Sequence, residues 1–312
     1  MLKVSRTKKF KASDGVKKYG DEWQNYVMLI LPLIGFFVFT CYPLLWAVGL
    51  SFFNYDGVAA NTRFVGLENI ISAFRDKTYW STWITTFEFA LYKVPIEMVL
   101  ALSLALILNR KLKGTGFFRS VFFLPNVISM SLMAVVIFNM FDVHGFVNHI
   151  LTTLRFMDAP VEWFGKKFTA LTVLVVGSIW NSFGINVIYF IAALNNVPEE
   201  CYEAAKIDGA TKWQTFRCVQ LPLMAPVMQT ILLLSINGTL HVGEYVYVMT
   251  GGAPGGTTHT VMSYLLSKYT PGIAGSVVNL GYGCSLSFIT SVIMCLIAIG
   301  YSKLSKKMSE VC

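Results

Sequence analysis

Charged residues are scarce in this chain of 312 residues. Asp, Glu, Lys and Arg make up 13% of it, while 55% of the residues are hydrophobic and 14% are aromatic. Soluble domains carry about 25% charged residues, so this composition argues against a soluble enzyme and against a disordered chain. The apolar residues are gathered into long runs without charge, which indicates a protein that lies in a lipid bilayer.

Several chemical signatures are also absent. No G-x-x-x-x-G-K-[ST] loop occurs, and the glycine-rich segment 250–257, TGGAPGGT, is interpreted as a turn-rich loop. We therefore expect this chain to bind no cofactor. The six cysteines show no C-x-x-C spacing and the four histidines match no metal motif, so neither a disulfide framework nor a metal site is predicted.

Six hydrophobic runs are long enough to cross a membrane, since a spanning helix needs about 20 apolar residues. One of them carries Glu88, Lys93 and Glu97, of which Lys93 and Glu97 stand four residues apart and are expected to pair on one helix face. We interpret these charges as structural rather than as a proton path. The fold class predicted is all-α, a polytopic membrane protein with six transmembrane helices, over 23–55, 80–108, 120–141, 168–198, 218–243 and 269–302.

The distribution of Lys and Arg predicts the orientation. If the N-terminus is cytoplasmic, 17 of these residues lie in inner segments and seven in outer loops, as the positive-inside rule requires. Both termini are then inside, with an N-terminal tail over 1–26, a transmembrane domain over 27–302 and a C-terminal tail over 303–312. The net charge of +8 is explained by topology, so no nucleic-acid partner is expected.

The segment 195–222, between the fourth and fifth runs, looks like two short helices. Asn196 is a candidate N-cap, Pro198 stands near the first turn, Gly209 is a stop signal, and Thr211 is positioned to cap a second helix. Taken alone, such a segment could be an ordinary amphipathic connector at the membrane surface.

The spacing within this segment is more specific. It matches E-A-A-x(3)-G-x(9)-[IV]-x-L-P without a gap, through Glu203, Gly209, Val219 and Leu221-Pro222. It resembles the cytoplasmic coupling loop of ABC-importer permeases, in particular the maltose (MalF)- and glycerol-phosphate-type carbohydrate permeases. Segments at 31–53, 64–69, 117–125, 145–148 and 250–258 are similar to that family too, and the resemblance covers the chain from about 26 to 307.

The resemblance implies the type I importer permease fold and a half-pore in the bacterial inner membrane. It also implies a second permease subunit, two cytoplasmic ATPase subunits that bind ATP and Mg²⁺, and an external binding protein that delivers a saccharide. The residues it assigns to ATPase coupling are Glu203, Ala204, Ala205, Asp208, Gly209, Ala210, Leu221 and Pro222.

Polar and aromatic residues in the fourth and fifth runs are candidates for saccharide binding, because amides and aromatic rings suit sugar hydroxyl and C–H groups. The alternative is that they make interhelix contacts, as small polar residues often do in membranes. His241 and Glu244 could also simply pair with each other. The candidates are Trp180, Asn181, Asn186, Ser235, Asn237, Gly238, His241, Glu244 and Tyr245, with Ser182 and Gly184 as weaker ones.

Two other function classes remain open at this point. A secondary carrier would show inverted repeats with broken helices, and no clear internal repeat is visible. An intramembrane serine protease would need a serine in a suitable motif, and Ser285 and His241 lack that context. A permease subunit driven by partner ATPases is the function that the sequence favours.

Overall fold

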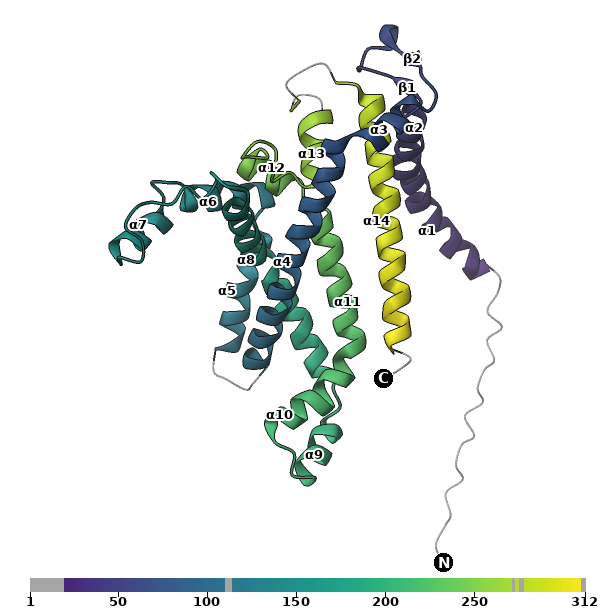
Figure 1. Ribbon diagram of the computed structural model, residues 1–312. Helices are drawn as coiled ribbons and strands as arrows, with labels where there is room; N and C mark the ends of the chain where they lie inside the picture. Colours follow the sequence, from purple (N-terminus) through teal and green to yellow (C-terminus); the bar gives the residue numbers. More distant parts are fainter. Residues whose placement is uncertain (1–19, 110–113, 271–272, 275–277, 310–312) are drawn as a thin grey trace, which may run out of the picture. The chain divides into compact units, whose positions relative to one another are not determined.

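The computed structural model describes residues 20–109, 114–270, 273–274 and 278–309. Its helices are shown in Figure 1. Six of the described helical stretches are long and apolar enough to cross a membrane, which confirms the predicted number. They are Tyr26–Leu50, Lys77–Leu108, Met130–Thr153, Lys167–Asn195, Lys212–Leu240 and Leu280–Ser305.

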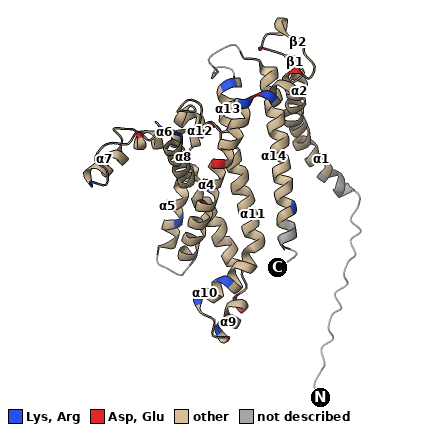
Figure 2. Ribbon diagram, viewed as in Figure 1, with Lys and Arg blue, Asp and Glu red and all other residues tan. Residues whose placement is uncertain are grey.

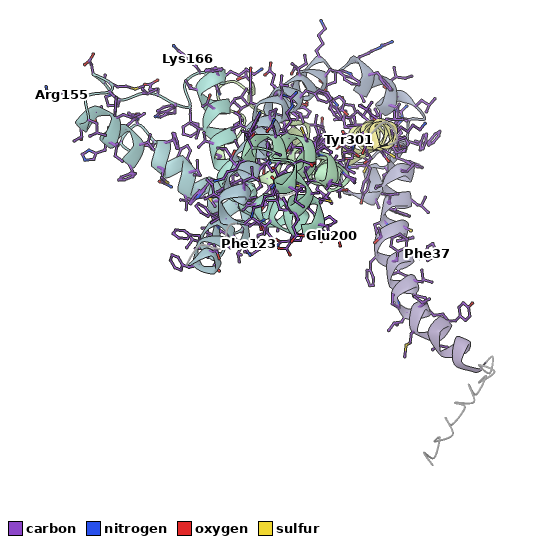
Figure 3. The ribbon with its side chains drawn as sticks, turned by 90° about the horizontal axis from the view of Figure 1, so that it is seen from below. Phe37, Phe123, Arg155, Lys166, Glu200 and Tyr301 are labelled. Carbon is purple, nitrogen blue, oxygen red and sulfur yellow. The ribbon has the colours of Figure 1, made fainter. Side chains whose placement is uncertain are left out.

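The chain divides into two units, with the boundary at Gly49. The first contains α1 (Gly20–Phe36), a π-helical turn (Phe37–Cys41) and most of α2 (Tyr42–Leu50). Its apolar side chains project outwards, as Figure 3 shows for Phe37, which is 60% exposed. Exposed apolar surface of this extent is expected on a helix that lies in lipid or against another membrane helix.

The second unit is a helical bundle centred on α4 (Lys77–Leu108), α8 (Lys167–Asn195) and α11 (Leu221–Leu240). Part of its core is formed where Ala101 and Ala105 of α4 meet Val187 and Phe190 of α8 and Ile231 of α11. Alanine lets membrane helices approach closely, so dispersion contacts can hold them together where the hydrophobic effect does not.

The third predicted span differs from the expectation of one helix over 120–141. The chain forms α5 (Thr115–Val127), α6 (Met130–Phe141) and α7 (Phe146–Thr153), with a break between α5 and α6. At the break, Ile128 and Ser129 both adopt ψ 136°, which no helix can accommodate. The hydropathy of the sequence does not reveal this change of direction, because the residues on both sides of the break are apolar.

The sixth predicted span also begins later than expected. Helix α13 (Val261–Tyr269) ends at Thr270, whose ψ of 119° is extended, and α14 (Leu280–Ser309) starts only after it. Helix α14 therefore continues past the predicted domain boundary at 302. At the other end of the chain, α1 begins at Gly20 rather than at 27, and residues 1–19 of the predicted tail lie outside the described residues.

The remaining elements lie around the second unit. A two-stranded hairpin pairs β1 (Phe53–Asn54) with β2 (Arg63–Phe64). Helix α3 (Glu68–Arg75) follows it and packs against α14. Short helices α9 (Glu199–Ile207) and α10 (Lys212–Thr215) lie between α8 and α11, and α12 (Glu244–Thr250) precedes α13. In Figure 1, α9 and α10 lie at the opposite end of the bundle from α12 and α13.

Candidate functional site

The segment between α8 and α11, residues 195–222, forms a projecting loop at one end of the bundle. Figure 2 shows Lys, Arg, Asp and Glu on α9 and α10, whereas the long helices carry few charges along their length. Trp213 and Ile207 are 66% and 85% exposed. A well-ordered loop that exposes large apolar side chains beside charges has the composition of a protein contact surface.

The loop is held in shape by local hydrogen bonds. Gly209 ends α9 with φ 74°, a value that glycine adopts without strain, and the Ala210 N–H donates to the Ala205 carbonyl over 2.9 Å. Thr211 forms a capping box with Gln214 at the start of α10. The predicted helix stop at Gly209 and the predicted cap at Thr211 are confirmed. The prediction for Asn196 was wrong, because Asn196 ends α8 and Pro198 stands at the N-cap position of α9.

Most of the predicted coupling residues surround one cavity of about 630 Å³ in the projecting loop. Glu203 lies outside its lining and is exposed, whereas Leu221 lines a different cavity. Cys201, Gln214 and Cys218 line the first cavity as well. Sequence reasoning did not include these three. Only Gln214 had a signal that could have identified it, since it stands three residues after Thr211, at the partner position of a capping box. The predicted residues that line the cavity are Ala204, Ala205, Asp208, Gly209, Ala210 and Pro222.

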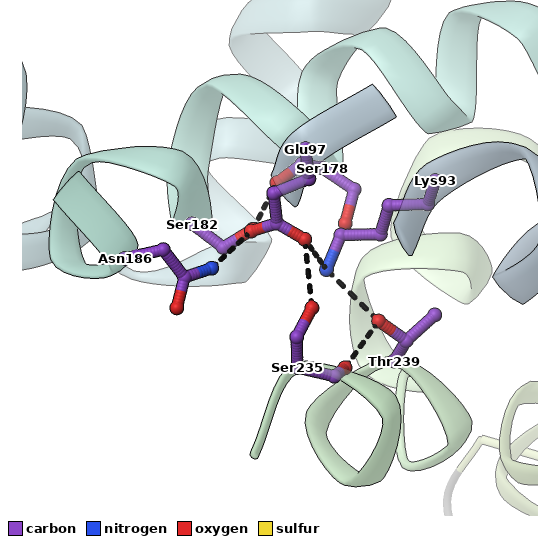
Figure 4. A network of polar contacts seen from close by, with 7 residues as sticks. All are labelled: Lys93, Glu97, Ser178, Ser182, Asn186, Ser235 and Thr239. Atoms are coloured by element: carbon purple, nitrogen blue, oxygen red, sulfur yellow. Dashed lines mark hydrogen bonds and ion pairs between the residues drawn. The ribbon is translucent and has the colours of Figure 1, made fainter. Parts of the chain in front are cut away.

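A buried polar network joins the three central helices (Figure 4). Glu97 of α4 is completely buried and forms an ion pair with Lys93, with Nζ and Oε2 3.3 Å apart. Its other contacts come from the neighbouring helices. The hydroxyls of Ser182 and Ser235 donate to Glu97 over 2.5 and 3.0 Å, and the Asn186 amide donates over 2.8 Å.

The network satisfies both charges. Each carboxylate oxygen of Glu97 accepts two contacts, and the Lys93 ammonium also donates to the Thr239 hydroxyl over 3.0 Å. A buried charge without partners is very costly, so Lys93 and Glu97 are held in place by α8 and α11. The predicted pairing of Lys93 with Glu97 is confirmed, while Glu88 instead pairs with Lys167 over 2.6 Å.

Several predicted saccharide-binding residues make interhelix contacts in this structure. Asn186 and Ser235 bind Glu97, as does Ser182. The Asn181 amide donates to the Pro125 carbonyl over 2.8 Å, and the Tyr245 hydroxyl donates to the Leu174 carbonyl over 3.0 Å.

Gly184 has a similar structural role. A Cβ atom at Gly184 would lie 2.0 Å from the Phe122 carbonyl oxygen, so glycine is required where α8 meets α5. This is the alternative that the sequence left open for these positions, and their part in saccharide binding stays a prediction.

The other candidates are exposed. Trp180 is 41% exposed, and Asn237, Gly238, His241 and Glu244 are also exposed. The alternative that His241 pairs with Glu244 is not found in the described part of the chain. Instead, Nδ1 of His241 lies 2.8 Å from the Asn237 carbonyl oxygen, and the Glu244 carboxylate accepts a hydrogen bond from Ser131.

His241 and Glu244 line a cavity of about 610 Å³ formed by α12, α13, α14 and the segment that joins α11 to α12. Tyr247 and Tyr269 line it too, together with apolar residues such as Met262. Sequence reasoning missed the two tyrosines, which lie in the short helices α12 and α13. Residue 247 falls between the fifth and sixth predicted spans and residue 269 at the very start of the sixth, where neither hydrophobic periodicity nor a motif distinguishes them. We call this space the tyrosine cavity.

The glycine-rich segment 251–258 forms consecutive turns, as predicted. It surrounds His259, whose ring lies so close to Gly252 that a Cβ atom there would approach it to 2.2 Å. The ring also contacts the Ser263 hydroxyl over 3.1 Å. Burial disfavours the imidazolium and, together with the positive charge of Lys268, lowers the pKa of His259 below its usual value.

The bundle, its buried network and the projecting loop define a polytopic membrane protein whose fold is that of an importer permease. The chain belongs to the family of binding-protein-dependent transport system inner membrane components, whose family model matches residues 97–310. It is therefore a membrane transport subunit. The matched region includes the whole projecting loop, α8, α11 and the part of α4 from Glu97 onwards.

Curated relatives match almost the whole chain. It is 30% identical to the trehalose/maltose transport system permease protein MalF of Thermococcus litoralis, over 93% of this chain and 96% of that protein. It is also 30% identical to the lactose permease protein LacF of Rhizobium radiobacter, over 91% and 94% of the two chains. The arabinooligosaccharides permease protein AraP of Bacillus subtilis is 31% identical, over 92% and 90%.

Solved structures share the fold. A bacterial ABC transporter involved in import of the acidic polysaccharide alginate has a chain that superposes with a TM-score of 0.79 at 21% identity, over 93% of this chain and 97% of that one. The alginate transporter in complex with its alginate pentasaccharide-bound periplasmic protein gives 0.80 at 19% identity, over 93% and 96%.

We predict that Glu97→Leu destabilises the protein by about 3–5 kcal/mol, because it leaves the Lys93 ammonium buried without its partner. The double variant Lys93→Met/Glu97→Leu removes both charges and should recover most of that loss. Glu88→Gln, at a partly exposed pair, should cost at most about 1 kcal/mol. Thermal unfolding in detergent measures all three, and a double variant no more stable than Glu97→Leu would contradict the interpretation.

We also predict that the protein loses stability as the pH falls below about 6.5, the ordinary pKa of histidine. Below this pH the unfolded chain takes up a proton at His259 before the folded chain does, so protonation favours unfolding. Melting temperatures between pH 7.5 and 5.5 should fall less steeply for His259→Gln than for the unmodified protein. His149→Gln, at an exposed histidine, is the control, and equal pH dependence in both variants would refute the role of His259.

Proposed function

We propose that this chain is one half of the pore of an ATP-driven carbohydrate importer. A second permease subunit completes the pore, two cytoplasmic ATPase subunits bind ATP and Mg²⁺, and an external binding protein delivers the saccharide. The chain itself binds no cofactor. The observation that carries the proposal is the projecting loop, an ordered pair of helices whose E-A-A-x(3)-G sequence lies at the exposed end of the bundle.

The loop is suited to transmit motion because of its two ends. It follows α8 directly and leads through a π-helical turn (Phe216–Gln220) into α11. Both of these helices contact Glu97, so a displacement of the loop acts on a unit that includes α4. Closure of the ATPase dimer would push on the loop and tilt the unit between inward-open and outward-open forms, which is rigid-body alternating access.

The orientation follows from the same assignment. An ATPase partner is cytoplasmic, so the projecting loop faces the cytoplasm and the tyrosine cavity, at the opposite end of the bundle, faces outwards. This agrees with the excess of Lys and Arg in the segments predicted to be inside, and it puts both termini in the cytoplasm of a bacterial inner membrane.

A saccharide substrate is supported by the relatives, whose names state trehalose/maltose, lactose and arabinooligosaccharides as what they transport. Among the predicted binding residues, the exposed Trp180, Asn237, Gly238, His241 and Glu244 are the ones with side chains or backbone available to a passing ligand.

Purification of the complex from membranes tests the function. A tagged chain should bring a second permease and ATPase subunits with it, and the complex in liposomes should hydrolyse ATP faster when the loaded binding protein is added. A chain that purifies alone and transports a solute along an ion gradient would contradict the proposal and favour a secondary carrier.

We predict that Glu203→Lys and Gly209→Asp each lower binding-protein-stimulated ATP hydrolysis about tenfold or more, while membrane insertion stays intact. At Gly209 a Cβ atom meets nothing within 4 Å in this chain, so an added side chain would project towards the ATPase from strained backbone. At Glu203 the change reverses the charge that faces the partner.

The control for the charge change is Glu162→Lys, at an exposed residue outside the projecting loop. It should retain stimulated ATP hydrolysis. Normal stimulation in Glu203→Lys and Gly209→Asp, with ATPase subunits still bound, would show that the loop does not couple the two parts.

A further inference from the structure

The tyrosine cavity has the chemistry of a carbohydrate site. Its volume of about 610 Å³ lies within the range of small-molecule pockets. Tyr247 and Tyr269 supply aromatic rings, His241 and Glu244 supply hydrogen-bonding groups, and apolar side chains complete the wall. None of these groups belongs to the buried network, which is formed by other residues of α4, α8 and α11.

Two of the hydrogen-bonding groups that line the cavity, on His241 and Glu244, act as acceptors, beside hydroxyl groups such as those of Tyr247 and Ser287. Nδ1 of His241 faces the Asn237 carbonyl over 2.8 Å and therefore carries a proton, so in the neutral ring Nε2 is an acceptor. The Glu244 carboxylate accepts from the Ser131 hydroxyl, and a carboxylate has about four acceptor positions in all. Both groups thus have acceptor capacity for the hydroxyl groups of a sugar.

Two residues of the cavity wall, Tyr269 and Met262, pack closely against the backbone at glycine positions. A Cβ atom at Gly283 of α14 would lie 2.7 Å from Tyr269, so this tyrosine packs directly against the α14 backbone. A Cβ atom at Gly243 would lie 2.8 Å from Met262. Tyr269 also contacts Tyr282 edge to face, with ring centroids 5.6 Å apart. A rigid aromatic wall binds a ligand at low cost in conformational entropy.

The charge of the residues that line the cavity bears on whether it suits neutral or acidic saccharides. Among the described residues that line it, Glu244 is the one carboxylate and none is Lys or Arg. Among the described residues, Glu244 forms no ion pair, and the buried Lys93 is bound to Glu97 and Thr239. An acidic saccharide would meet the Glu244 carboxylate with no Lys or Arg among the described lining residues to compensate it, and like charges at short range repel.

We infer that the tyrosine cavity is a subsite for uncharged saccharides and that Glu244 disfavours acidic ones. The hydroxyls of a neutral sugar donate to Glu244 and His241, and its C–H faces lie against Tyr247 and Tyr269. This inference rests on the proposed function and specifies its substrate class. The alginate transporter, whose fold is similar, imports an acidic polysaccharide, so the fold is compatible with either charge and the lining decides.

Ligand-observed saturation-transfer NMR on the complete transporter in nanodiscs tests the subsite, because this method detects weak binding. The probes are maltotriose, which is neutral, and a trigalacturonate, which carries carboxylates. We expect maltotriose to bind the unmodified complex more tightly than trigalacturonate. In Glu244→Gln, maltotriose binding should weaken about fivefold, since a hydrogen bond to a charged acceptor is lost, and trigalacturonate binding should strengthen.

The control is Glu88→Gln, the same substitution at a residue that does not line the cavity; it should change neither affinity. Equal or tighter binding of trigalacturonate by the unmodified complex, no binding of maltotriose, or unchanged affinities in Glu244→Gln would each overturn the inference. The proposed function is judged separately, by ATP hydrolysis stimulated by a loaded binding protein. If the complex hydrolyses ATP in response to a saccharide but shows one of those results, the proposed function stands and the inferred subsite is rejected.

Discussion

The burial of Glu97 is the constraint on which the arrangement of the bundle depends. A carboxylate with no exposure to solvent has to find its hydrogen-bond donors inside the protein, and Glu97 finds them on three helices. The donors from α8 and α11 reach the Glu97 carboxylate only if both helices lie beside α4 at the level of Glu97 along its axis. An apolar contact would allow the helices to slide, whereas this network specifies one register.

The same constraint positions the projecting loop. Helix α8 leads into it and α11 leads out of it, so both of its connections are held to α4 by one side chain. Short-range devices, namely the glycine turn at Gly209 and the capping box at Thr211, keep the loop itself rigid. The projecting loop can transmit the proposed displacement only if its own shape and its attachment to the bundle are both fixed. Here a different set of hydrogen bonds fixes each of them.

The two ends of the second unit differ chemically. The projecting loop carries charges and exposed apolar side chains, which suits a protein partner (Figure 2). The opposite end has a cavity with tyrosines and a single carboxylate, which suits a small polar molecule. Between them the helices use alanine and glycine to approach one another closely, as Ala105 does in α4 and Gly184 does where α8 crosses α5. The proposed sites for the saccharide and for the ATPase are therefore separate, and the central helices link them.

What the sequence determined by itself is everything that depends on local composition and spacing. The number of spans, the Lys93–Glu97 pair, the helix stop at Gly209, the cap at Thr211 and the family could be predicted, because a helix needs about 20 apolar residues and a motif lies within one segment. The tertiary structure decided the contacts between segments. It broke the third span at Ile128, used Asn186 and Ser235 to satisfy Glu97, and brought Tyr247 and Tyr269 together with Glu244. These outcomes depend on which helices become neighbours, and neighbours that are far apart in sequence leave no trace in the hydropathy or spacing of either one.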